Sequence, residues 1–152
     1  MKQFYVEQIF ATIFALNNKI QEHSNRLTDE ITLRQFMLLL AIEHIPADEC
    51  SYNRIAEKIG TSKQNVKQIV QSLEKKQYVI VTASTTDKRA VNVTMTKGGI
   101  NAAVGFVKAS KQMIKDTADN FTAEELSHLW DLLKRLYAFD GIEMKGFDQH
   151  DS

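Results

Sequence analysis

The fold is decided by residues 51–73, which read SYNRIAEKIGTSKQNVKQIVQSL. Apolar residues recur at the i, i+3, i+4, i+7 spacing of a helix face in each half of this stretch. They are Tyr52, Ile55, Ala56 and Ile59 in the first half, and Val66, Ile69, Val70 and Leu73 in the second. Gly60 ends the first helix, and Ser51 and Ser62 are the expected N-caps. Two short helices joined by a glycine turn predict a helix-turn-helix.

A β-hairpin is predicted directly after these two helices. Residues 78–82 (YVIVT) have the composition of a strand, and residues 91–95 (VNVTM) alternate apolar and polar side chains as a half-buried strand does. The polar turn between them carries Asp87, Lys88 and Arg89. A helix-turn-helix followed by a hairpin is a winged helix. We therefore predict a mainly α-helical fold with a small β-hairpin wing.

Longer helices are predicted on both sides of the winged helix-turn-helix, which we place at residues 31–97. The segments 1–28 and 98–140 are apolar at helical spacing, with a broad apolar stripe along residues 126–136. These faces exceed what so small a core can cover, so we expect them to form a dimerisation region with a second copy of the chain. A monomeric helical bundle is the alternative.

The two polar segments of the chain are expected to be irregular. Residues 21–30 should end the first helix in a loop. Residues 141–152 are polar with two glycines, and we expect a loosely ordered tail there.

The net charge of the chain is zero at neutral pH, but the charges are unevenly placed. Residues 54–97 hold nine lysines and arginines against three acidic residues, whereas the segments before and after each carry a net charge of −3. A basic block between acidic segments suits phosphate neutralisation and keeps the remaining surface away from nucleic acid. Chance clustering on a solvated face is the alternative.

The second helix of the pair has side chains suited to reading DNA. No carboxylate occurs between residues 61 and 73, so this helix can approach phosphates without repulsion. Amides can pair with adenine, lysine can donate to guanine, and a serine at the helix N-terminus can contact a phosphate. The candidate DNA-binding residues are Ser62, Lys63, Gln64, Asn65, Lys67, Gln68 and Gln71. A merely solvated face is the alternative, but such faces usually include Asp or Glu.

The wing supplies further candidate contacts, Lys88 and Arg89. A guanidinium at the end of the wing turn can enter a narrow minor groove, where the negative potential is strongest. Asp87 is out of place on a DNA face unless its carboxylate orients Arg89 through a charge-assisted bond. An ordinary turn with Asp at a favoured position explains Asp87 equally well.

These motifs resemble those of the MarR family of bacterial regulators. The resemblance covers about residues 4–138 and rests on TLRQ at 32–35, the helix at 51–60, LEKK at 73–76, DKR at 87–89 and TMTKG at 94–98. It implies a transcriptional regulator that binds a pseudo-palindromic double-stranded operator as a homodimer, with the fourth helix in the major groove and Arg89 in the minor groove. It also implies repression that is relieved by a small-molecule effector or oxidant acting between the two lobes.

Two positions depart from the family's pattern. Gln77 stands where the family usually has glycine after the fourth helix, and a left-handed conformation there would cost about 1 kcal/mol. Val81 stands where a basic residue is common, so that phosphate contacts from the first wing strand are expected to be fewer.

No catalytic constellation is present in the sequence, and we do not expect an enzyme. The histidines form no metal-binding spacing, so no metal and no cofactor is expected; they are His23, His44, His128 and His150. Cys50, the single cysteine, could sense oxidants if the helix start after it lowers its pKa, and a plain loop thiol is the alternative. A winged helix that only binds protein is a third class, against which the basic block argues.

The expected location is the cytoplasm. No apolar run approaches the roughly 20 residues that span a bilayer, and the N-terminus lacks the pattern of a signal peptide. A single cysteine forms no internal disulfide, which fits a reducing compartment.

Overall fold

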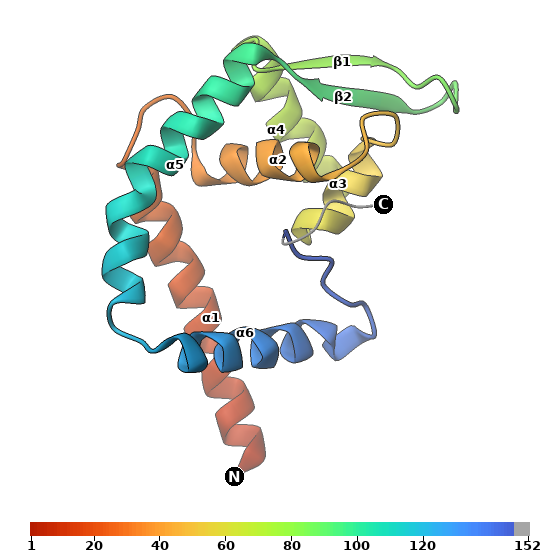
Figure 1. The fold of residues 1–152 in the computed structure, drawn as a ribbon. Coiled ribbons are helices and arrows are strands. Elements are labelled where there is room, and N and C mark those ends of the chain that lie inside the picture. Colours follow the sequence, from red (N-terminus) through yellow and green to blue (C-terminus); the bar gives the residue numbers. More distant parts are fainter. Residues whose placement is uncertain (148–152) are drawn as a thin grey trace.

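The computed structural model describes residues 1–147. Within them, the chain forms helices and one two-stranded antiparallel sheet, which lies at the upper edge of the molecule (Figure 1). The elements are α1 (Lys2–Asn25), α2 (Leu33–His44), α3 (Tyr52–Ile59), α4 (Lys63–Lys75), β1 (Val79–Ala83), β2 (Val91–Met95), α5 (Lys97–Ala118), α6 (Ala123–Tyr137) and the 3-10 turn η1 (Ala138–Asp140). The winged helix-turn-helix and its flanking helices are thus confirmed. None of the described helices is long and apolar enough to cross a membrane.

Side chains cap the starts of four helices, among them the two serines expected from the sequence. The hydroxyl of Thr32 accepts the N–H of Gln35, and the Gln35 side chain accepts the N–H of Thr32 at 3.0 Å. Thr122 and Glu125 form the same reciprocal pair at the start of α6. The serines before α3 and α4 each accept one backbone N–H. These bonds satisfy N–H groups that a helix start otherwise leaves without partners.

Helix α1 is longer than the sequence predicted. It continues to Asn25 instead of ending near residue 20. Residues 21–25 are polar and mostly exposed, but glutamine and glutamate are good helix formers. Glu22 also pairs with Arg26 one turn later, at 2.5 Å, which supports the last turn by a few tenths of a kcal/mol.

The core lies where α2, α3 and α4 meet the sheet. Its fully buried side chains include Leu38, Leu39, Ile55, Val66, Val70, Leu73, Val79 and Val93. The first half of α5 covers one side, and its Phe106 stacks on Phe36 with ring centroids 4.4 Å apart. The strands are held in register by pairing of Val81 with Val93. Truncating Leu38 to alanine in this core would cost roughly 2–5 kcal/mol.

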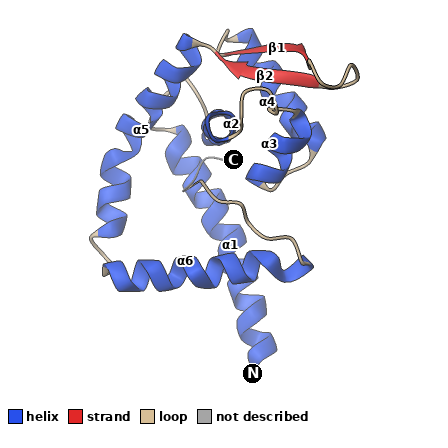
Figure 2. Ribbon diagram, turned by 45° about the vertical axis from the view of Figure 1, so that its right-hand side comes forward, coloured by secondary structure: helices blue, strands red, loops and turns tan. Residues whose placement is uncertain are grey.

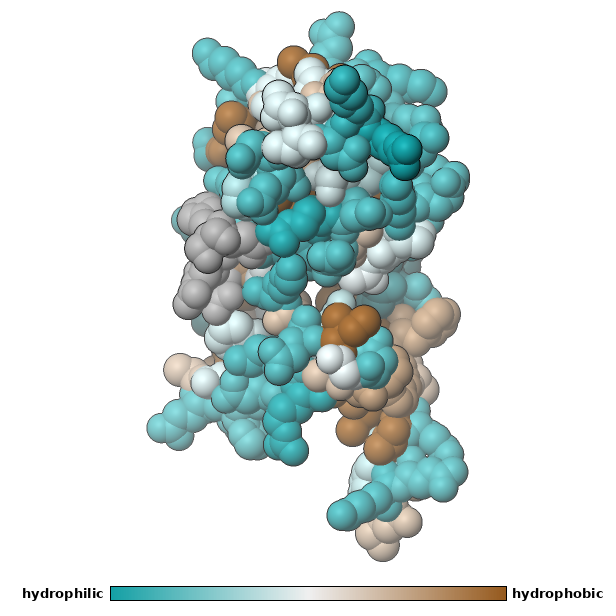
Figure 3. All heavy atoms as spheres, turned by 90° about the vertical axis from the view of Figure 1, so that its right-hand side faces the viewer, coloured by the Kyte–Doolittle hydropathy of each residue, from teal (hydrophilic) through white to brown (hydrophobic). Residues whose placement is uncertain are grey.

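The terminal helices stand outside this core. Helix α6 contains no buried residue, and Ser24 is the one buried residue of α1. Figure 2 shows α1 and α6 extending away from the winged helix. Figure 3 shows apolar side chains gathered on this lower part of the molecule, whereas the upper part is mainly hydrophilic.

The segment after α6 returns to the winged helix. Residues 141–147, expected to be loosely ordered, end with the half-buried ring of Phe147 packed against the core. Residues 141–145 are exposed and form no helix or strand, and the apolar ring of Phe147 lies in a partly buried place beside α2 and α3. Residues 148–152 of the same expected tail lie outside the described residues.

Candidate nucleic-acid interface

Helix α4 turns its polar side chains outward because its apolar side chains are fixed in the core. Val66, Val70 and Leu73 are 0% exposed. The predicted contact residues are all exposed, namely Ser62, Lys63, Gln64, Asn65, Lys67, Gln68 and Gln71. Gly60 ends α3 with a φ of 69°, a left-handed conformation that glycine adopts at little cost. This turn sets α4 across α3 and presents to solvent the polar residues of α4 from Lys63 to Gln71, among which there is no carboxylate.

Three cationic side chains from α4 and the wing meet at one hollow. Lys63 and Lys67 of α4 and Arg89 of the wing line a space of about 230 Å³. The remaining lining residues are Tyr52, Asn53, Ala90 and Val91. No carboxylate is among them, so the hollow suits an anion of the size of a DNA phosphate.

Tyr52 and Asn53 are further candidate contacts that the sequence does not indicate. Spacing places Tyr52 on the apolar face of its helix, and Asn53 has no distinguishing feature besides its place just after the Ser51 cap. In the structure both lie at the start of α3, on the wall of the hollow. Burial, and then the charge of Glu74, raise the pKa of Tyr52, so its hydroxyl remains a hydrogen-bond donor.

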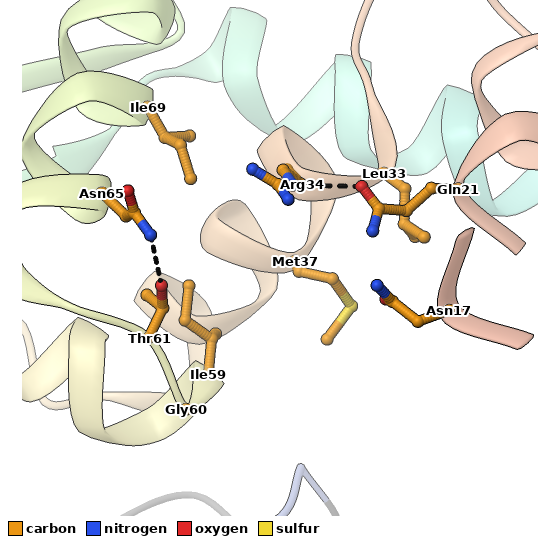
Figure 4. A pocket seen from close by; sticks show the side chains of 10 residues that line it. All are labelled: Asn17, Gln21, Leu33, Arg34, Met37, Ile59, Gly60, Thr61, Asn65 and Ile69. Atoms are coloured by element: carbon orange, nitrogen blue, oxygen red, sulfur yellow. Dashed lines mark hydrogen bonds between the residues drawn. The ribbon is translucent and has the colours of Figure 1, made fainter. Parts of the chain in front are cut away.

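Asn65 takes a different position from the lysines. Its amide donates to the Thr61 hydroxyl at 3.1 Å. It lines a pocket on the side of α4 that faces α1 and α2, as Figure 4 shows. The structure therefore brings Lys63, Lys67 and Arg89 together, and it places Asn65 at the edge of their face.

The wing turn is organised by Asp87, through the backbone. Its carboxylate accepts the main-chain N–H of Arg89 at 2.9 Å, and the N–H of Ala90 donates to its carbonyl at 3.0 Å. Within residues 1–147, no hydrogen bond or ion pair joins the Asp87 carboxylate to the Arg89 guanidinium. Of the two interpretations of Asp87, the structure shows the turn: the carboxylate accepts a main-chain N–H in an Asx-type turn, and no charge-assisted bond joins it to the guanidinium. Lys88 and Arg89 are both exposed.

Gln77 joins α4 to the wing in a strained conformation. It has a φ of 61°, so the left-handed form considered from the sequence is the one adopted. The turn keeps the hydrogen bonds that close a helix end: the N–H of Tyr78 donates to the carbonyl of Leu73 at 3.0 Å, and the Thr96 hydroxyl donates to the carbonyl of Gln77 at 2.7 Å. These bonds fix the wing relative to α4.

Cys50 is not an activated thiol. It is 1% exposed, and its carbonyl accepts the N–H of Val93 at 2.9 Å. Burial raises the pKa of the thiol to about 12, although Arg54 opposes the shift. The hypothesis of a redox sensor with a lowered pKa is therefore wrong, and the thiol is inert packing. In the described part of the chain no group of three or more His, Cys, Asp or Glu residues could hold a metal ion.

A second pocket separates the helical region from α4. It has a volume of about 300 Å³ and takes side chains from α1, α2 and the helix-turn-helix (Figure 4). Arg34 lies in it, with its Nε donating to Gln21 at 3.0 Å. The pocket has an apolar wall, and no carboxylate lines it; the residues are Asn17, Gln21, Leu33, Arg34, Met37, Ile59, Gly60, Thr61, Asn65 and Ile69.

A helix-turn-helix whose second helix has no carboxylate from Lys63 to Leu73, followed by a hairpin with two exposed cations, is typical of the winged-helix class of nucleic-acid-binding proteins. Residues 30–90 match the sequence model of the MarR family. This stretch is 61 of the 152 residues, and over it the chain is similar to the MarR family.

Two relatives are named as HTH-type transcriptional regulators. SarZ of Staphylococcus aureus is 24% identical over 98 residues, which are 62% of this chain and 65% of SarZ. The match therefore spans less than two thirds of that relative. PapX of Escherichia coli is 25% identical over 125 residues, which are 81% of this chain and 76% of PapX.

Solved structures share the fold. A mutant MarR from E. coli complexed with operator DNA is 23% identical, with a TM-score of 0.75 over 87% of this chain and 95% of that one. The organohalide-sensing regulator RdhR in its 2,4-dichlorophenol-bound form is 19% identical, with a TM-score of 0.77 over 91% of this chain and 82% of that one.

Proposed function

We propose that the protein is a cytoplasmic homodimer that binds a pseudo-palindromic operator in double-stranded DNA. In this proposal α4 enters the major groove and Arg89 enters the adjacent minor groove. The observation that carries it is the hollow between α4 and the wing, where three cations converge without a carboxylate. A phosphate seated there would fix the register of α4 on the duplex.

The division of labour along α4 follows from position. Lys63 and Lys67 face the hollow and would neutralise the backbone. Gln64 and Gln68 are exposed one helical turn apart, and their amides can pair with the N6 and N7 atoms of adenine. The lysines would then supply affinity for any DNA, and the glutamines would supply the preference for one sequence.

The apolar faces of α1 and α6 support the dimer. Leu129, Trp130 and Leu133 are 42–45% exposed, although they occupy successive positions of one stripe on α6. Phe10 and Phe14 are 45% and 70% exposed on α1. A second copy would bury both stripes by an isologous contact, and it would place two α4 helices on one side of the assembly.

The pocket between α1, α2 and α4 supports regulation by a small molecule. Its apolar wall and the Arg34 guanidinium suit a ligand with an apolar body and an anionic or hydrogen-bonding group. Asn65 and Ile69 of α4 belong to the lining, so a bound ligand would contact the proposed recognition helix directly. We propose that the protein is a repressor and that such a ligand releases it from DNA.

In vitro selection from random duplexes tests the proposed function. The protein should enrich two inverted half-sites whose centres are about ten base pairs apart. The Lys67→Ala protein should recover the same sequence with lower affinity. Selection that enriches no sequence, with equal binding to all duplexes, would contradict sequence-specific regulation.

A further inference from the structure

The segment of residues 137–147, here called the C-terminal strap, joins the helical region to the helix-turn-helix. Figures 1 and 2 show the chain passing from the end of α6 back towards α3. Tyr137 abuts Gly60, because a Cβ placed on Gly60 would lie 2.8 Å from the Tyr137 hydroxyl oxygen. Near the other end, Lys145 lies 3.7 Å from the Glu57 carboxylate.

Phe147 is the main anchor of the strap. Its ring stands edge-on to the ring of His44, with centroids 5.7 Å apart. The ammonium group of Lys58 lies 5.6 Å from the centre of the same ring. Lys58 is only 3% exposed, so this cation–π contact is formed away from water, where such contacts are strongest. The exposed pair of Lys145 and Glu57 contributes little by comparison.

The strap contacts the helix-turn-helix near both of its ends. A groove of about 630 Å³ separates the middle of the strap from α3. One contact is at the turn between α3 and α4, and the other is on the side of α3 and the end of α2. A brace fixed at two separated points restricts rotation of one body against another more than a single contact does.

We infer that the strap sets the orientation of the helix-turn-helix relative to the helical region. Tyr137 and Phe147 are thus positioning residues for DNA binding. The inference rests on the proposed function, in which the helical region joins two subunits. Two α4 helices can occupy two half-sites together only if their spacing matches the duplex. A braced orientation lowers the entropy lost when both helices dock, whereas binding to a single half-site needs no such match.

The test compares a full operator obtained by selection with a duplex carrying one half-site. Phe147→Ala should weaken binding to the full operator by about tenfold, equivalent to about 1.4 kcal/mol. Its binding to the half-site should remain that of the unaltered protein. Phe147→Tyr keeps the ring and should restore full-operator binding. Met144→Ala is the matched control, because it shortens another apolar side chain of the strap, one that is 40% exposed.

A second measurement needs no DNA. In the Gln71→Cys protein, a spin label attached at position 71 of each subunit reports the distance between the two α4 helices. Phe147→Ala should broaden this distance distribution, and Met144→Ala should leave it unchanged. Equal weakening on full and half operators, tighter binding by Phe147→Ala, or an unaltered distance distribution would each overturn the inference. A protein that selects no sequence but shows the broadening would refute only the proposed function.

Discussion

Gln77 adopts a strained backbone conformation in the turn that joins α4 to the wing. Its φ of 61° lies in the left-handed region, where a side chain is disfavoured. The hydrogen bonds of Tyr78 and Thr96 around it hold the conformation in place. The family resemblance raised this possibility from the sequence, but only the backbone shows that the strained form is adopted.

Gln77→Gly should therefore stabilise the folded protein. We expect the free energy of unfolding to rise by about 1 kcal/mol, because glycine adopts this conformation without strain. Urea unfolding followed by circular dichroism measures it. Gln71→Gly, at an exposed position inside α4, should instead destabilise by about 1 kcal/mol. A lower stability of the Gln77→Gly protein would mean that the side chain makes a compensating contact.

Cys50 should resist alkylation in the folded protein. Its thiol is buried and its pKa is raised from the ordinary 9.0 to about 12, so it stays protonated at mildly alkaline pH. Mass spectrometry after iodoacetamide treatment should find modification only when urea is present. Because the unfolded thiol ionises first, its contribution to stability should fall as pH rises from about 9 towards 12. Rapid modification of the native protein would contradict this account.

Among the elements, those with a strong local signal were predicted correctly. The caps at Ser51 and Ser62 begin helices as expected, because each side chain accepts a nearby backbone N–H. The end of α1 and the course of residues 141–147 were not predicted. The course of 141–147 depends on contacts between distant segments, such as that of Phe147 with Lys58, which no local pattern contains.

Single and double variants of the wing turn test how Asp87 acts on Arg89. Arg89→Ala should weaken DNA binding without changing folding, and it should lower the salt dependence by about one unit of slope. If Asp87 positions Arg89 through the turn, Asp87→Ala should also weaken binding although it removes a negative charge. The double variant should then resemble Arg89→Ala alone. Tighter DNA binding by the Asp87→Ala protein would mean that the carboxylate only repels the DNA phosphates and does not position Arg89.

At the scale of the whole molecule, the sequence indicated a surface that the single chain does not cover. The stripe on α6 was visible as a helical repeat of leucines, and in the structure Leu129 and Leu133 remain exposed. The meeting of Lys63, Lys67 and Arg89 at one hollow was not visible, because α4 and the wing are brought together only by the folded core. Charge counts along the chain showed the basic block but not its shape.

Substitutions in the exposed apolar stripe of α6 test the proposed dimer. Sedimentation at micromolar concentration should give a dimer for the unaltered protein. Leu129→Glu together with Leu133→Glu should give a monomer, because carboxylates cannot be buried unpaired in an apolar contact. Ser127→Glu, on the polar side of the same helix, should leave the dimer intact. A stable monomer in the unaltered protein would favour the alternative of a self-contained helical bundle.

The measurement closest to the central claim compares variants of α4 on the selected operator and on random duplex. Gln64→Ala or Gln68→Ala should weaken operator binding by roughly 1–3 kcal/mol for each base that the amide reads, and should barely affect random DNA. Lys67→Ala should weaken both alike, because a phosphate contact carries no sequence information. Equal weakening on both duplexes for all three variants would show that α4 does not read the operator.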